Sequence, residues 1–262
     1  MVRAVDVVFS VILALGVTGG TAAAWGEPVA VRFPESTGRG FLTLNSQRGD
    51  ILAYGDVVQT LRKDSIMESH LVFRFKDGSV YDETVTFSQQ KVFRLLAYRL
   101  TQRGKSFPET IEVAFDRASG RYRARAGAGG ETAEGTVDLP EDLHNGMTGA
   151  LLKNLPAGAS GKGHLLTFLP KPQLLKTVLR PEATDKFFVG DVTHTATRYL
   201  VKLEIRGLTG VIARLVGKDP PDLRYWVATG PAPAFVKFEG AMFLKGPRWR
   251  IELGTPRWPE ER

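Results

Sequence analysis

Histidine is the side chain in this sequence whose chemistry best suits metal binding or proton transfer, and the chain contains four. They are His70, His144, His164 and His194, and no two have the close spacing that places two imidazoles on one metal ion. Ser69 precedes His70, but neighbouring residues of a strand point to opposite faces, so these two are not a nucleophile and its base. We predict that each histidine is a surface or turn residue, and that the chain binds neither a metal ion nor a cofactor.

Two short motifs match catalytic or nucleotide-binding signatures only in part. Ser88-Gln89-Gln90-Lys91 has the Ser-x-x-Lys spacing of penicillin-recognising enzymes, but neither Ser-Asp-Asn nor Lys-Thr-Gly follows it. Gly161-Lys162 has Pro156 where a phosphate-binding loop needs its first glycine. The chain contains no cysteine, which excludes a catalytic thiol, a thiolate metal site and a disulfide. We predict that the protein is not an enzyme. A hydrolase of unknown class is the third alternative. A carboxylate pair for such chemistry is close in space and not in sequence, so the sequence alone neither reveals nor excludes one.

Arginine is concentrated in one short stretch of a basic chain, whose formal net charge is +7. Arg121, Arg123 and Arg125 alternate with Tyr122 and Ala124, so a strand would aim all three guanidinium groups to one side. This pattern predicts an anion-facing surface, with an anionic membrane surface as a possible partner. The alternative is an exposed edge strand that carries charge against aggregation. Nucleic acid is not an expected partner for an exported protein.

The first residues have the features of a signal peptide. Arg3 precedes an apolar run over residues 7–17 that is too short to span a membrane, and Ala22-Ala23-Ala24 supplies small residues for cleavage. We therefore predict a signal peptide over residues 1–24 and one mature domain over residues 25–262. An uncleaved anchor is the alternative. Export without cysteine indicates a periplasmic or secreted protein without a lipid anchor, and no other stretch is long and apolar enough to span a membrane.

A β-hairpin over residues 67–87 is the clearest structural element. A two-residue turn at Asp77-Gly78 would pair Phe73 with Asp82 and mix charged with apolar side chains. A three-residue loop over residues 76–78, with Gly78 left-handed, separates the two kinds. The apolar face then holds Met67, Leu71, Phe73, Phe75, Tyr81, Val85 and Phe87. The polar face holds Glu68, His70, Arg74, Asp82, Thr84 and Thr86, together with Val72 and Val80.

Further strands and one helix are indicated along the rest of the chain. The candidate strands are residues 29–33, 41–44, 51–61, 92–100, 107–115, 121–125, 165–169, 174–179, 187–189, 199–205, 211–216, 225–229, 235–238 and 249–253. The helix is predicted over Leu139 to Asn154, with Asp138 as its N-cap and an apolar stripe of Leu143, Met147, Ala150 and Leu151. His144 would then lie on an exposed helical turn.

So many strands with one helix predict an all-β, mainly antiparallel fold. We expect a single curved sheet that forms a closed or half-open barrel, with the helix in or over its mouth; a β-sandwich is the alternative. A barrel of this width needs a plug or a ligand, and its apolar interior favours an apolar or lipid-like one. The predicted function is an exported binding or carrier protein for such a ligand. The alternative is a structural or interaction module of the cell envelope that uses the basic strands. The predicted ligand-binding residues are Phe73, Tyr81, Met147, Leu151, Tyr199 and Trp226.

Overall fold

The computed structural model of the chain describes residues 26–127, 130, 132–168, 172–204, 222–243 and 245–254. The predicted signal peptide, the candidate strand over residues 211–216 and the last residue of the candidate strand over 199–205 lie outside these ranges. In the described ranges, no helix is long and apolar enough to cross a membrane.

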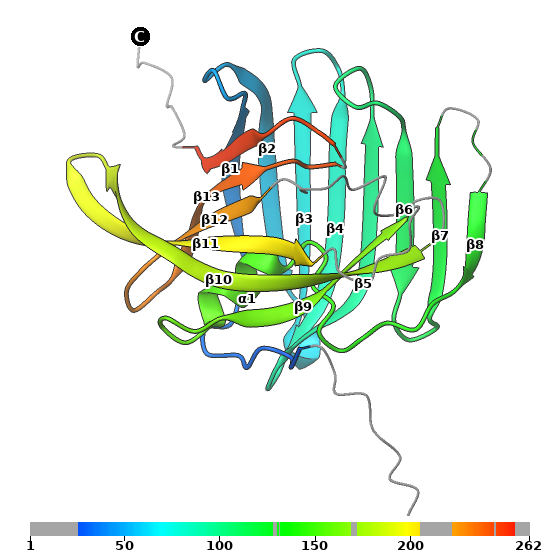
Figure 1. Cartoon of the computed structure of the whole chain (residues 1–262), viewed down its shortest axis with the longest axis horizontal. Helices are drawn as coiled ribbons and strands as arrows, with labels where there is room; N and C mark the ends of the chain where they lie inside the picture. The colour runs from blue at the N-terminus through cyan, green and yellow to red at the C-terminus, as the bar shows by residue number, and fades with distance from the viewer. Residues whose placement is uncertain are drawn as a thin grey trace, which may run out of the picture.

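The described strands form one antiparallel sheet of fourteen strands (Figure 1). They are β1 (Gly38–Asn45), β2 (Ile51–Leu61), β3 (Ile66–Phe75), β4 (Val80–Gln89), β5 (Phe93–Arg103), β6 (Ile111–Asp116), β7 (Arg121–Ala126), β8 (Thr132–Thr136), β9 (Gly161–Phe168), β10 (Pro172–Val189), β11 (Val192–Glu204), β12 (Leu223–Ala228), β13 (Ala234–Gly240) and β14 (Trp249–Leu253). A short 3-10 helix, η1 (Lys63–Ser65), precedes β3, and one α-helix, α1 (Thr148–Asn154), lies between β8 and β9.

The order of the strands explains how the sheet curls. Strands β1 to β8 follow one another outward, the chain then crosses to the opposite edge, and β9 to β14 return until β14 pairs with β1. At the far edge, Phe168 of β9 packs its ring against Phe115 of β6 and Tyr122 of β7, with centroids 6.5 and 5.3 Å away. The two edges approach through side chains, and the sheet is curved but not closed (Figure 1). The predicted all-β fold is confirmed in its half-open form, in place of the two-sheet sandwich.

The register of the central hairpin is as the face pattern predicts. Phe73 of β3 is paired with Tyr81 of β4, and the amide of Phe75 donates to the carbonyl of Ser79, which leaves the three-residue loop over residues 76–78. Gly78 has a φ of 84°, the left-handed conformation that a glycine adopts without strain. The apolar face therefore turns inward along the whole hairpin.

Most of the other candidate strands are found, with some differences in extent. Residues 29–33 make only one isolated bridge, from Ala30 to Val92. The candidates at 174–179 and 187–189 belong to the single long strand β10. Strand β8 was not predicted, because its sequence Thr-Ala-Glu-Gly-Thr has no apolar alternation.

The prediction that the arginine-rich strand lies at an edge is wrong. Strand β7 pairs with β6 on one side and with β8 on the other. Arg123 forms an ion pair with Glu134 of β8 at 3.2 Å, and Arg125 forms one with Glu112 of β6 at 3.3 Å. Because two of the three guanidinium groups already face carboxylates, the prediction of an anion-facing surface now depends mainly on Arg121.

The predicted helix start is also wrong, because α1 begins at Thr148 and not after Asp138. Residues 142–145 instead run along the free edge of β9. The amide of His144 donates to the carbonyl of His164, and the amide of His164 donates to that of Asp142. The Asn145 amide side chain both donates to and accepts from the backbone of Leu166, at 2.8 Å each. Backbone groups used in this way cannot make helical hydrogen bonds, so the sheet edge competes successfully with helix formation.

The end of the helix and the burial of its predicted stripe are as expected. Leu143, Met147 and Leu151 are buried, and Ala150 is half-buried, although only the last two lie in α1. Asn154, the last residue of α1, is buried and its side chain accepts from the amides of Arg32 and Phe33 at 2.7 and 2.6 Å. The helix is therefore tied to the chain that leads into β1, and it packs inside the curve of the sheet (Figure 1).

Candidate functional site

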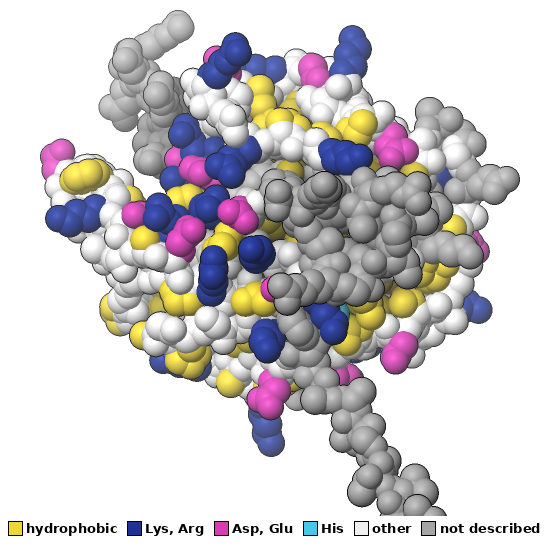
Figure 2. Space-filling view, viewed as in Figure 1, with side chains coloured by type: hydrophobic (Ala, Val, Ile, Leu, Met, Phe, Trp, Pro, Cys, Tyr) yellow, Lys and Arg dark blue, Asp and Glu magenta, His cyan; other side chains and the backbone are white. Residues whose placement is uncertain are grey.

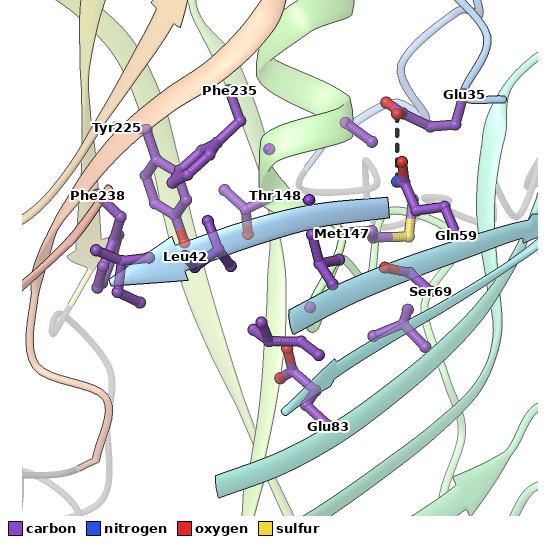
Figure 3. Close-up of a pocket in the computed structure, with 18 of the residues that line it drawn as sticks. Glu35, Leu42, Gln59, Ser69, Glu83, Met147, Thr148, Tyr225, Phe235 and Phe238 are labelled. Carbon is purple, nitrogen blue, oxygen red and sulfur yellow. Dashed lines mark hydrogen bonds between the residues drawn. The ribbon is translucent and has the colours of Figure 1, made fainter. Parts of the chain in front are cut away.

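A cavity of about 580 Å³ lies inside the curve of the sheet, between β1 to β5, α1 and strands β11 to β14. Its size is in the range of small-molecule sites in proteins. Leu42 of β1, Met147 and Thr148 of the α1 region and the aromatic side chains of β12 and β13 face one another across it (Figure 3). The alternation of the strands places these side chains inward, and α1 covers them.

Aromatic and polar side chains occupy different ends of this cavity. Tyr225, Phe235 and Phe238 lie together at one end, where the rings of Tyr225 and Phe238 are 4.9 Å apart (Figure 3). At the other end, Gln59 donates to Glu35 at 3.3 Å, and Lys153 of α1 forms an ion pair with the same carboxylate. The site therefore has an apolar end and a polar end whose charges are matched.

Apart from these polar groups, the carboxyl of Glu83 in β4 points into the cavity (Figure 3). The hydroxyls of Tyr81 and Tyr98 both donate to its Oε1 atom, at 3.0 and 2.7 Å. Burial raises the pKa of Glu83, and the two tyrosine hydrogen bonds oppose this by stabilising the carboxylate. Burial also raises the pKa of Tyr81, Tyr98 and Tyr225, and the charge of Glu83 raises each further. Glu83, Tyr81 and Tyr98 therefore form one buried, hydrogen-bonded cluster at the cavity wall, and Tyr225 is near enough to be affected by its charge.

Glu83 is the candidate site residue that the sequence pattern did not identify. It stands between Tyr81 and Val85, and period-two alternation places it on the same inward face as both. The sequence could have identified Glu83, because it is a single carboxylate on an otherwise apolar strand face.

No family model and no curated protein sequence matches the chain. Among solved structures, it is similar to a β-barrel-like protein of a domain of unknown function, DUF1849, from Brucella abortus. The match has 9% sequence identity and a TM-score of 0.48, and covers 82% of this chain and 94% of the other.

The structure places two of the six predicted ligand-binding residues, Tyr81 and Met147, in the cavity lining. Phe73, Leu151 and Tyr199 are buried in the hydrophobic core around it and do not line it. They are core residues behind the wall of this cavity, so their prediction as direct ligand contacts is not supported by its lining. The alternation pattern identifies the inward face but does not distinguish residues of the cavity wall from residues packed behind it.

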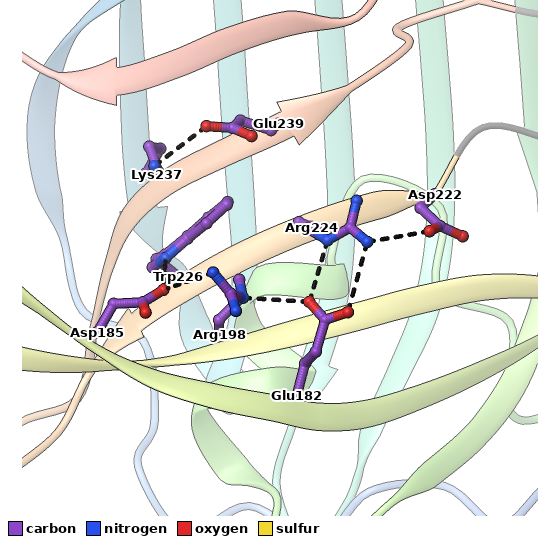
Figure 4. A network of polar contacts seen from close by, with 8 residues as sticks. All are labelled: Glu182, Asp185, Arg198, Asp222, Arg224, Trp226, Lys237 and Glu239. Atoms are coloured by element: carbon purple, nitrogen blue, oxygen red, sulfur yellow. Dashed lines mark hydrogen bonds and ion pairs between the residues drawn. The ribbon is translucent and has the colours of Figure 1, made fainter.

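Trp226, the sixth, lies on the outer face of β12 (Figure 4). Its indole Nε1 donates to Asp185 at 2.7 Å, and the ammonium of Lys237 lies 3.8 Å from the ring centroid. Nearby, Glu182 accepts from Arg224 at 3.0 Å and pairs with Arg198 at 3.1 Å. Lysine and arginine side chains are interspersed with aspartate and glutamate over this outer face, as Figure 2 shows. Trp226 therefore belongs to an ionic surface network, and its prediction as a cavity residue is wrong.

Two histidines are also placed differently from their prediction as surface or turn residues. His144 is fully buried, with its Nδ1 atom 2.9 Å from the hydroxyl of Thr148 and its Nε2 atom 2.7 Å from that of Thr177. Burial, with a smaller contribution from the nearby His164, lowers the pKa of His144 to about 4, although a backbone hydrogen bond acts in the opposite direction. His164 is mostly buried and lies 2.7 Å from Asp142. Across the described ranges, no group of three potential ligands is arranged to hold a metal ion.

Proposed function

We propose that this chain is an exported binding or carrier protein that holds an apolar or lipid-like ligand in the cavity beneath α1. The observation that carries the proposal is the cavity of about 580 Å³, in whose lining aliphatic residues (including alanine) and aromatic residues together outnumber the others. An apolar ligand gains about 25 cal/mol for each Å² removed from water, which favours such a cavity over bulk solvent. We place the protein in the periplasm or outside the cell on the strength of the signal-peptide pattern in residues 1–24.

The cell-envelope interaction module is the weaker candidate. It requires a free basic face, but Arg123 and Arg125 are paired with glutamates. Arg121 and Arg123 also line a shallow outer hollow that contains Glu68, Asp116 and Glu134, so the local charge is mixed. A mixed surface attracts anionic membranes less than a uniformly basic one.

Native mass spectrometry of the mature protein, purified from periplasm without detergent, tests the proposal. We expect a bound species that adds the mass of a lipid or fatty amphiphile and is released by organic extraction. A protein that remains free of ligand after purification, and that binds none of added 1-decanol, decanoate and decylammonium, would contradict a binding function.

A further inference from the structure

The charged residues of the cavity wall are not all matched. Glu35, Arg39, Glu83 and Lys153 are the four lining residues that carry formal charge. Glu35 pairs with Lys153, and Arg39 pairs with Asp56 at 2.6 Å. Glu83 has no cationic partner within the part of the chain that the structure describes. Either protonation of the carboxyl or a cationic group on a bound ligand would therefore compensate this charge.

The two oxygens of the Glu83 carboxyl differ in their surroundings. Oε1 accepts both tyrosine hydroxyls, whereas no described side chain or amide donates to Oε2. The residue is about nine-tenths buried, and its carboxyl points into the cavity (Figure 3). Removing a carboxylate from water is costly unless a partner replaces the lost solvation. Oε2 is the position at which a ligand donor would do this.

The side chains around Glu83 favour a particular kind of donor. Tyr81 and Tyr98 hold the carboxyl from β4 and β5, and Tyr225 approaches from β12 on the opposite side of the cavity. Tyrosine rings attract cations through their electron-rich faces, and a carboxylate forms a strong, charge-assisted hydrogen bond with an ammonium group. A fatty acid, in contrast, would bring a second carboxylate to a site that already holds one.

We propose that the ligand of this cavity is an amphiphile with an ammonium head group, and that the ammonium pairs with Glu83 among Tyr81, Tyr98 and Tyr225. The apolar chain then lies along Leu42 and Met147. This inference rests on the proposed binding function and specifies the chemistry of its ligand.

The pairing has a definite dependence on pH. The ionisable groups that face Glu83 are the phenols of Tyr81, Tyr98 and Tyr225, which stay neutral near pH 7 because burial raises the pKa of each. Burial also raises the pKa of Glu83, so acid protonates it and removes the charge that attracts the ligand. An alkylammonium keeps its own proton up to about pH 10. The ratio of the protein's affinity for an alkylammonium to its affinity for a neutral ligand of the same length should therefore rise as pH increases through the Glu83 pKa. Above that pKa the ratio should level off.

Calorimetric titration of the mature protein with decylammonium, 1-decanol and decanoate, each below its micelle-forming concentration, tests this. We expect decylammonium to bind most tightly and decanoate least tightly at pH 7. In the Glu83→Gln variant, the ratio of decylammonium to decanol affinity should fall by about 30-fold or more, as when one member of a buried charge pair is lost. Glu134→Gln removes an exposed carboxylate from β8 and is the matched control, with all three affinities unchanged.

The pH titration of the wild-type protein provides the same test without a substitution, in case Glu83→Gln does not fold. If decanol and decanoate bind but decylammonium is no tighter, or if its advantage is independent of pH, the ammonium assignment is wrong and the binding function remains. If none of the three compounds binds, both proposals are wrong.

Discussion

Truncation of Leu152 to alanine is expected to lower the free energy of unfolding by about 2 to 5 kcal/mol. Leu152 is 1% exposed and packs with Leu179, Tyr199 and Val201 of strands β10 and β11. Its neighbour Leu151 packs in a different cluster, with residues of β3 to β7 and β9. The helix α1 thus joins both halves of the curved sheet. Truncation of either leucine leaves a cavity that the closely packed neighbouring side chains do not fill.

Urea unfolding followed by circular dichroism measures this effect. Leu61→Ala, at an exposed position at the end of β2, is the matched control and should change stability by well under 1 kcal/mol. If α1 were instead a mobile lid, Leu152→Ala would cost little, and the amides of α1 would exchange rapidly until an apolar ligand was added. That result would contradict the role of α1 as a fixed plug.

Acidification from pH 6.5 toward pH 4 is expected to lower the stability of the folded state by about 3 kcal/mol through His144 alone. The unfolded imidazole takes up a proton near its ordinary pKa of 6.5, whereas burial lowers the pKa of the folded one to about 4. The unfolded state therefore binds more protons within this window, and stability falls as pH falls. Glu83 has the opposite effect on stability. Because its pKa is raised in the folded state, the folded state binds that proton more tightly and gains stability as pH falls.

The free energy of unfolding, measured in urea at several pH values across this window, tests the prediction. His144→Gln keeps a side chain able to hydrogen bond with Thr148 and Thr177 but cannot take up a proton, so the slope of stability against pH should become shallower. His194→Gln removes an exposed imidazole and provides the reference slope. An unchanged slope in His144→Gln would show that the buried imidazole does not govern the acid response.

The parts of the fold that follow from local periodicity were predicted from the sequence. The hairpin register is one example, because a shift by one residue would pair Phe73 with Asp82 and place Phe73 and Tyr81 on opposite faces. The helix start could not be predicted in this way. Asp138 and Glu141 form a good capping pattern, but the free edge of β9 binds residues 142–145, and this partner is distant in the sequence.

The site was predicted only as an apolar interior. Tyr225 and Trp226 are adjacent aromatic residues, and the sequence does not show that the first faces the cavity and the second the ionic outer surface. His144 provides a similar case, since its partner Thr177 belongs to β10 and only the tertiary fold brings the two together. Glu83 could have been found, because an acidic residue at an inward position of a strand requires a partner or a function.

Filling the cavity from Gly149 of α1 is the most direct test of the claim that this space binds a ligand. Gly149 lines the cavity, and a Cβ atom added there has no other atom within 4 Å. Gly149→Ala should bind 1-decanol as the wild type does. Gly149→Leu should be at least as stable, because leucine favours a helix more than glycine, and yet should bind decanol about tenfold or more weakly. If Gly149→Leu folds and binds decanol as tightly as Gly149→Ala, the ligand does not occupy this cavity.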